Sequence, residues 1–233
     1  MRIRPVGAHA LLLDFAVTPG APTGTDGNTA PPDLGGCAAN QAYDADVATT
    51  VEAWRAELWR RRDQGDLVAT EIVPAAATVL LDGVPDPPAT AARIAGWTPA
   101  PPTATAAAST VEVPVTYDGE DLPVVAAHWR VDVPAVVRRL RETEFRVAFC
   151  GFAPGFGYLT GLPTELAVPR LATPRPRVPA GSVALAGPYA GIYPTASPGG
   201  WLLVGRTGLT LFDVRADPPA RLTPGTRVRL VPA

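Results

Sequence analysis

The stretch GFAPGFGYLTGLP, residues 151–163, decides the fold of this chain, and it comes just after a strand-like run. Its glycines argue against a helix, and its aromatic side chains argue against a flexible linker. We therefore expect a shaped turn in which Phe152, Phe156 and Tyr158 are packed. Such a turn is either a structural corner or one wall of a binding site.

Short apolar runs recur on the C-terminal side of this turn, between segments rich in Gly and Pro. They are SVALAG at 182–187, WLLVG at 201–205, LTLFDV at 209–214 and RVRLV at 227–231. No helical spacing is found after residues 146–149. Short strands separated by such turns predict a closed or nearly closed β-barrel.

On the N-terminal side of the turn, VEVPVTY at 111–117 alternates with period two, which predicts a strand. Two short helices are expected next. The second has Asp132 as its candidate cap and Pro134 in its first turn. Together with the barrel strands, these elements form a predicted domain over residues 111–233.

Residues 1–96 are predicted to form a separate, small α/β domain. We expect a strand within 2–17, a helix from Asp46 with apolar side chains at helical spacing, and strands at 67–73 and 78–81. The fold class is therefore α+β.

Two further segments lack apolar periodicity. Residues 18–42 are rich in Pro, Gly, Thr and Ala, which predicts a mobile insert in the first domain. Residues 97–110 have the Pro, Ala and Thr composition of a linker.

Composition excludes several classes of function. The chain has 233 residues, 47% of them hydrophobic, with a formal net charge of −2. It can bury a substantial core, and it has no global attraction for nucleic acid or anionic lipid. Because no 18-residue apolar stretch is present, we expect no membrane association and a cytoplasmic location.

The residue types that are missing narrow the chemistry further. The chain contains no lysine, which excludes a Walker phosphate-binding loop and Schiff-base catalysis. With only His9, His128, Cys37 and Cys150 available, neither a Cys-rich nor a three-histidine zinc site can be built. We predict no metal site of these kinds and two free thiols.

Three strings between residues 151 and 213 carry a resemblance to a known family. They are the opening stretch, PRLATPRPRVPAGSVALAG at 169–187 and GIYPTASPGGWLLVGRT at 191–207, followed by LFD at 211–213. The chain resembles the family of the 5-oxoprolinase B subunits, also called allophanate hydrolase subunit 1, which includes a sporulation-kinase inhibitor and has a carboxyltransferase domain of the C/D type. The resemblance implies a small N-terminal α/β domain and a cyclophilin-like β-barrel.

The same resemblance implies a function. The chain would be one subunit of an ATP-dependent 5-oxoprolinase, inactive alone, with a C-type partner (allophanate hydrolase subunit 2) and an A-type subunit. ATP would bind at the interface with the partner or on it. The alternatives are an allophanate hydrolase or urea carboxylase type of carboxyltransferase subunit, and a regulatory inhibitor of a sensor histidine kinase.

Candidate binding residues follow from chemistry and resemblance together. Arg170 and Arg175 each follow a proline, so their guanidinium groups start from a rigid backbone suited to bidentate anion contacts, whereas Arg177 is expected to be peripheral. Small hydroxyls beside glycines can also contact an anion. The expected substrate- or nucleotide-binding residues are Gly151, Phe152, Pro154, Gly155, Phe156, Tyr158, Arg170, Arg175, Ser182, Tyr193, Ser197, Gly199, Gly200, Arg206 and Thr207.

Other polar residues are interpreted as structural. His128 is expected to be a partly buried helix residue, and no nucleophilic triad is supported. Asp118, Glu120 and Asp121 are interpreted as part of a solvated loop and helix start, so paired-carboxylate catalysis has no clear candidates. The chain departs from the family pattern at Leu140, where a histidine is usual, and at Tyr189 and Ala190, where Gln-Thr is usual.

Overall fold

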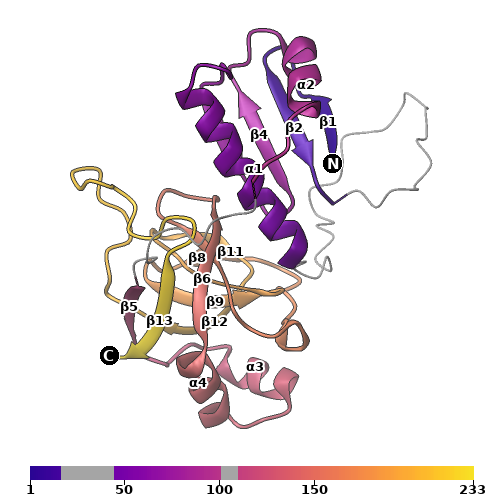
Figure 1. Ribbon diagram of the computed structural model, residues 1–233. Helices are drawn as coiled ribbons and strands as arrows, with labels where there is room; N and C mark the ends of the chain where they lie inside the picture. Colours follow the sequence, from indigo (N-terminus) through magenta and orange to yellow (C-terminus); the bar gives the residue numbers. More distant parts are fainter. Residues whose placement is uncertain (17–44, 101–109) are drawn as a thin grey trace. The chain divides into compact units, whose positions relative to one another are not determined.

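The computed structural model describes residues 1–16, 45–100 and 110–233, which fall into two compact units, Met1–Thr105 and Ala106–Ala233 (Figure 1). The predicted insert at 18–42 and most of the predicted linker lie outside the described residues. Each unit has its own hydrophobic core.

The first unit contains a four-stranded antiparallel sheet in the order β1-β2-β4-β3. The predicted single strand within 2–17 is wrong, because the chain forms two strands of a hairpin there. Gly7 has a φ of +67°, a left-handed conformation that lets the chain reverse between them. The strands are β1 (Arg2–Pro5), β2 (Ala10–Asp14), β3 (Glu71–Pro74) and β4 (Thr78–Asp82).

The core of the first unit lies between this sheet and two helices, α1 (Ala45–Asp63) and α2 (Pro87–Ala95). The predicted helix is confirmed as α1, and its Trp54 and Leu58 pack with Leu81 of β4. Helix α2 lies in a segment for which no helix is predicted. It begins after Asp86, whose Oδ1 accepts a hydrogen bond from Ala89 N at 3.0 Å.

The second unit is built around a seven-stranded sheet in the order β12-β9-β10-β7-β6-β13-β5. All neighbours are antiparallel except β13 and β5. A separate two-stranded ribbon pairs β8 (Arg175–Val178) with β11 (Ser197–Gly199). The seven strands are β5 (Thr110–Val115), β6 (Glu144–Cys150), β7 (Gly157–Thr160), β9 (Ser182–Ala186), β10 (Tyr189–Ile192), β12 (Leu202–Arg206) and β13 (Arg227–Pro232).

The two outer strands of this sheet meet and close it. Thr116, which follows β5, donates its backbone N–H to Arg206 O at 2.9 Å, and Arg206 N donates to Thr116 O at the same distance. Because β5 and β12 are the ends of the strand order, this bridge joins the sheet to itself. The predicted barrel and the α+β class are confirmed.

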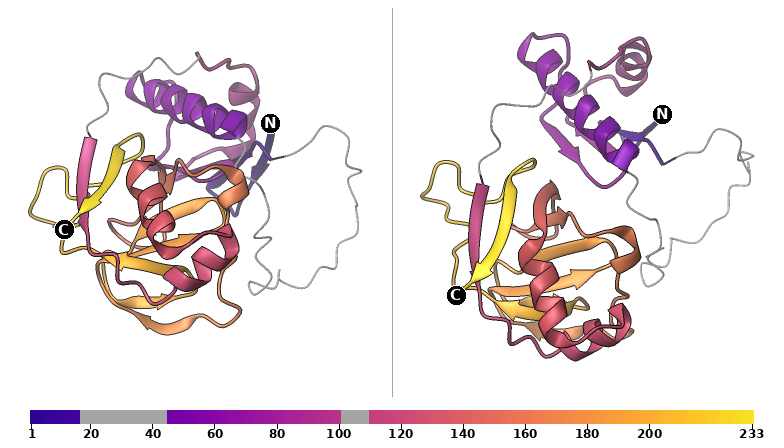
Figure 2. Two further views of the ribbon diagram at one scale, coloured as in Figure 1. Left: turned by 90° about the horizontal axis from the view of Figure 1, so that it is seen from below. Right: turned by 60° about the horizontal axis from the view of Figure 1, so that its bottom comes forward.

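Helices α3 (Leu122–Trp129) and α4 (Val133–Glu142) pack side by side against the barrel (Figure 2). Asp132 caps α4 as predicted, since its Oδ1 accepts from Ala135 N at 2.8 Å. Leu140 is fully buried in the barrel core, so the departure from the family pattern there is an apolar core contact. His128 is exposed, which corrects its predicted partial burial, and its Nε2 lies 3.0 Å from Ala167 O.

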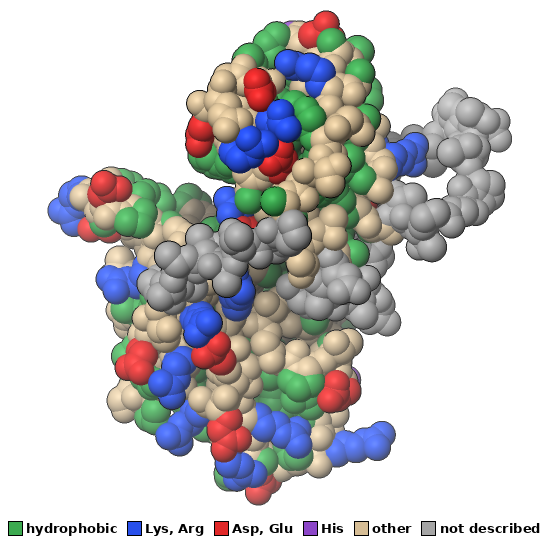
Figure 3. Space-filling model, in the orientation of Figure 1, with side chains coloured by type: hydrophobic (Ala, Val, Ile, Leu, Met, Phe, Trp, Pro, Cys, Tyr) green, Lys and Arg blue, Asp and Glu red, His purple; other side chains and the backbone are tan. Residues whose placement is uncertain are grey.

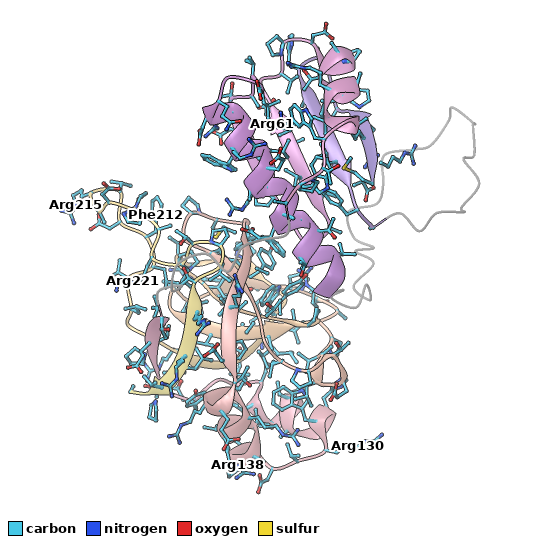
Figure 4. All side chains as sticks on the ribbon, viewed as in Figure 1. Arg61, Arg130, Arg138, Phe212, Arg215 and Arg221 are labelled. Carbon is cyan, nitrogen blue, oxygen red and sulfur yellow. The ribbon has the colours of Figure 1, made fainter. Side chains whose placement is uncertain are left out.

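The run at 209–214 is not a strand, contrary to prediction. Phe212 forms only an isolated bridge with Ala220, and Arg221 N donates to Leu211 O at 2.9 Å. These residues begin an arm that projects from the barrel, on which Figure 4 labels Phe212, Arg215 and Arg221. Residues 214–219 at its tip are all exposed, so the tip does not join the barrel core.

On the face of the second unit visible in Figure 3, Arg side chains are interspersed with Asp and Glu. That face therefore offers no broad surface of one sign to a polyanion. Across the described ranges, every helix is too short or too polar to cross a lipid bilayer.

Candidate functional site

A β-bulge in β6 turns one aromatic side chain out of the barrel core. Val147 pairs with Leu159 and points into the core, and strict alternation would put Phe149 on the same face. The register shifts by one residue between them, so Phe149 pairs with Tyr158 instead. Their rings stack at 4.3 Å on the outer face of the sheet.

These two rings belong to a larger group, here called the aromatic cluster. Its centre is the buried ring of Phe156, which contacts four other rings at centroid distances of 5.1 to 5.6 Å, all edge to face. Edge-to-face pairs are the favourable arrangement of aromatic quadrupoles. The cluster consists of Phe149, Phe152, Phe156, Tyr158, Tyr189, Tyr193 and Trp201.

The backbone passes close to these rings at two glycines. A Cβ on Gly191 would lie 2.8 Å from Phe156 Cζ and 2.9 Å from Trp201 Cζ3. A Cβ on Gly199 would overlap the Tyr193 hydroxyl. Both positions therefore require glycine for the cluster to pack.

The turn at 151–157 presents one ring of the cluster to solvent. Phe152 contacts Phe156 and Tyr193 edge to face, yet it is 60% exposed, so the prediction that it is packed holds only in part. Its φ of +66° is unusual for a residue with a bulky side chain. A strained, exposed aromatic residue is a candidate ligand contact.

Arg175 is held by carboxylates of the chain itself. Its Nη2 lies 2.8 Å from both carboxylate oxygens of Asp121, its Nε lies 2.7 Å from Glu120 Oε1, and its Nη1 donates to Trp201 O at 3.3 Å. Burial lowers the pKa of Arg175, but hydrogen bonds and charge from Asp121 and Glu120 raise it above its ordinary value. The guanidinium stays charged, and most of its N–H groups are already bonded to Asp121, Glu120 and Trp201 O.

Asp121 is only 6% exposed, which corrects the interpretation of 118–121 as a solvated loop. Besides Arg175, its Oδ2 accepts a hydrogen bond from Leu203 N at 2.6 Å. Sequence reasoning missed this role because both partners are remote along the chain. The only local signal, an Asp directly before a helix, indicates a cap, and Asp121 makes no side-chain cap hydrogen bond.

Arg170 is the exposed cation of the site. Within the described part of the chain it has no ion-pair partner, in contrast to Arg175. Burial raises the pKa of the Tyr193 hydroxyl, and the positive charge of Arg170 is the first of the influences that oppose this rise. Arg170 therefore acts electrostatically on Tyr193, whose ring contacts Phe152.

The two predicted serines face the layer between the β8–β11 ribbon and β9. Ser197 pairs with the buried Val178. Ser182 lies two residues before Ala184 on β9 and so shares its face, and Ala184 packs in the same apolar cluster as Val178. Ser197 Oγ is buried and, among the described atoms, has no hydrogen-bond partner. A buried hydroxyl without a partner is uncommon and marks a place where a ligand atom could bind.

The remaining predicted residues have local roles. Arg206 pairs with Asp118 at 2.7 Å, and both side chains are exposed. Thr207 Oγ1 accepts from Leu209 N at 3.2 Å, and Gly200 O accepts from Leu171 N at 2.8 Å. Gly151 and Pro154 lie exposed on the turn, and Gly155 packs against the arm.

Cys150, the cysteine near this part of the barrel, is not an activated nucleophile. Burial raises the pKa of the Cys150 thiol, which donates to Leu222 O at 3.3 Å, so the reactive thiolate is disfavoured. In residues 1–16, 45–100 and 110–233, no three His, Cys, Asp or Glu side chains are grouped to hold a metal ion. An exposed ring, an exposed guanidinium and a buried hydroxyl suit a small anionic ligand.

The sequence of this chain is similar over about half of its length to known proteins. The chain is 51% identical over 125 residues to the 5-oxoprolinase B subunit of Escherichia coli O157:H7, a match covering 52% of this chain and 57% of that protein. The chain spans about half the length of the curated relatives it matches.

Two solved structures with this fold are longer chains. The crystal structure of TTHA0988 superposes with a TM-score of 0.71 at 30% identity, covering all of this chain and 40% of that one. The urea amidolyase of Kluyveromyces lactis superposes with a TM-score of 0.65 at 19% identity, covering 99% of this chain and 15% of that one, and shows a shared fold.

The family model described as carboxyltransferase domain, subdomain C and D, matches residues 36–222. This span includes the turn, the aromatic cluster and both arginines of the site. The chain belongs to the carboxyltransferase domain family, subdomain C and D.

Proposed function

We propose that this chain is a subunit of an ATP-dependent 5-oxoprolinase, which opens 5-oxo-L-proline to L-glutamate with ATP hydrolysis. The observation that carries the proposal is the 51% identity to the B subunit of a bacterial 5-oxoprolinase. Identity at this level over 125 residues is far above the 19% shared with the urea amidolyase, which favours the oxoprolinase over the urea-linked alternative.

The chain acts with C-type and A-type partner subunits. Its relative is one lettered subunit of 5-oxoprolinase, which implies companion subunits, and this fold occupies 40% of the longer chain of TTHA0988. Burial also disfavours the thiolate of Cys150, which fits a chain that works together with partner subunits.

The aromatic cluster with Arg170 is the proposed substrate contact. 5-Oxoproline combines a small flat ring with a carboxylate, which match the exposed Phe152 ring and the exposed Arg170 guanidinium. We assign a further polar atom of the ligand to Ser197 Oγ, because this buried oxygen has no hydrogen-bond partner among the described atoms. Of the other predicted residues, Arg175 supports this site rather than contacting the anion.

The residues of this chain do not fit a self-contained site for magnesium-bound ATP. The chain has no lysine, and its described acidic side chains are not grouped around a cation site. We therefore assign ATP to the partner subunit or to the interface with it, and derive no step through ATP in this chain.

Reconstitution tests the proposal. The chain is combined with its C-type and A-type partners, and ADP release is measured with 5-oxoproline, with urea and with neither. We expect release that depends on 5-oxoproline. Release with urea alone would support the carboxyltransferase alternative. Inhibition of a sensor kinase without any ADP release would support the regulatory one.

A further inference from the structure

We infer that Asp121 is a positioning residue: through Arg175 it holds the β8–β11 ribbon against Tyr193, and thereby places the exposed Phe152 ring. Of the measurements that test this inference, only the kinetic one, KM for 5-oxoproline, rests on the proposed function. The contacts that carry it join three elements that are remote in sequence.

The first step is the anchoring of Asp121. Its carboxylate contacts Arg175 Nη2 through both oxygens at 2.8 Å and accepts from Leu203 N at 2.6 Å. Its backbone N–H donates to Leu203 O at 3.0 Å. The residue before a helix usually uses its side chain to cap that helix, but here the carboxylate is directed to β8 and β12 instead.

The second step is the ribbon. Arg175 is the first residue of β8 and pairs with Gly199 of β11, with an irregularity in the register between Gly199 and Ser197. Strands of four and three residues form few ladder hydrogen bonds, and an isolated two-stranded ribbon is marginally stable. The ribbon therefore depends on its side-chain contacts: Val178 is buried in the apolar cluster, and the anchored guanidinium also donates to Trp201 O.

The third step leads to the exposed ring. The backbone of Gly199 lies so close to the Tyr193 hydroxyl that no Cβ would fit between them. Tyr193 in turn supports Phe152 with ring centroids 6.0 Å apart. A shift of the ribbon is therefore transmitted through Tyr193 to the ring proposed to contact the ligand.

The chain contains a matched control for this ion pair. Arg206 Nε lies 2.7 Å from Asp118 Oδ2, close to the 2.8 Å of the Arg175–Asp121 pair, but these side chains are 69% and 44% exposed. Glu120, the other carboxylate on Arg175, is 63% exposed. Exposed ion pairs contribute little, whereas loss of one partner from a buried pair leaves an uncompensated charge. Because Asp121 is buried and the other two carboxylates are exposed, its loss should have the largest effect.

The experiment compares Asp121→Asn with Asp118→Asn and Glu120→Gln in the full chain. Amide hydrogen exchange is followed for the ribbon and for β9 and β10, and the Phe152–Tyr193 ring contact is followed by NMR. For Asp121→Asn we expect exchange in the ribbon to rise by at least about tenfold and the ring contact to weaken, with β9 and β10 unchanged. The two controls should stay within about twofold of wild type.

Kinetics of the reconstituted complex separate positioning from general loss of structure. For Asp121→Asn we expect KM for 5-oxoproline to rise at least about fivefold, with kcat within about twofold of wild type. If wild-type complex shows no turnover of 5-oxoproline, the proposed function fails, and exchange and ring contact still decide this inference.

Arg175→Lys covers the case in which Asp121→Asn does not fold. It keeps a cation beside Asp121 but removes the planar guanidinium that reaches Glu120 and Trp201 O. The ribbon should therefore loosen, while the charge of Asp121 stays compensated. A folded Asp121→Asn or Arg175→Lys chain with wild-type ribbon exchange and an intact Phe152–Tyr193 contact would overturn the inference.

Discussion

Gly155 lies against Phe212, with room for no side chain between them. A Cβ on Gly155 would be 2.8 Å from Phe212 Cβ, and the φ of Gly155 is +84°. The turn that carries the exposed ring is thus locked to the base of the projecting arm by a backbone contact that only glycine permits.

Substitution of Gly155 should therefore unfold the turn. Gly155→Val combines a forbidden φ with a steric overlap, and we expect a loss of about 2–5 kcal/mol in the free energy of unfolding. Chemical denaturation checks this value. Gly151→Ala is the matched control, because its Cβ would meet only Tyr158 Cε2 at 3.7 Å. Equal stability of the two variants would mean that the turn adapts freely.

The two phenylalanines of the turn should separate stability from binding. Phe156 is buried at the centre of the aromatic cluster, so Phe156→Ala should cost about 3–5 kcal/mol of folding free energy. Phe152→Ala removes an exposed ring and should cost under about 1 kcal/mol, while weakening turnover of 5-oxoproline by the complex. Denaturation curves and ADP release distinguish the two effects. A fully active, folded Phe152→Ala complex would remove this ring from the site.

Arg170 should act in binding rather than in folding. It is exposed and, in the described residues, has no ion-pair partner, so Arg170→Ala should leave the melting temperature close to wild type. Loss of a charged hydrogen bond to the ligand should raise KM for 5-oxoproline at least about tenfold. Arg177→Ala is the control, since Arg177 is exposed on the nearby β8. Identical KM values for both variants would argue against an anion contact at Arg170.

Alkaline pH should destabilise the barrel through Tyr117. Burial raises the pKa of its hydroxyl to about 12 from an ordinary value of 10.0. The unfolded chain therefore releases this proton first, and stability falls as pH rises from 10 toward 12. Tyr117→Phe removes the proton and should flatten this part of the stability curve, measured by urea denaturation from about pH 9 upward. Parallel curves for variant and wild type would contradict the assignment.

Elements whose apolar residues recur locally are predicted well. Helix α4 with its Asp132 cap and strand β5 with its period-two alternation both stand where their patterns place them. The first strand is misjudged because a hairpin with Gly7 in its turn has the same apolar content as one longer strand. The run at 209–214 misleads for a related reason, since apolar content alone does not show whether a partner strand is available.

The sequence by itself determined the α+β class, the barrel, the family and a turn lined with aromatic residues. These follow from residue spacing and motif strings, because burial of neighbouring apolar residues imposes a local period. Only the tertiary structure decided that Phe149 leaves the core, that Arg175 is occupied by Asp121 from 54 positions away, and that Arg170 has no ion-pair partner among the described residues. Strand register and ion pairing depend on which distant segments become neighbours, and a one-residue bulge reverses the face of a side chain without changing its local pattern.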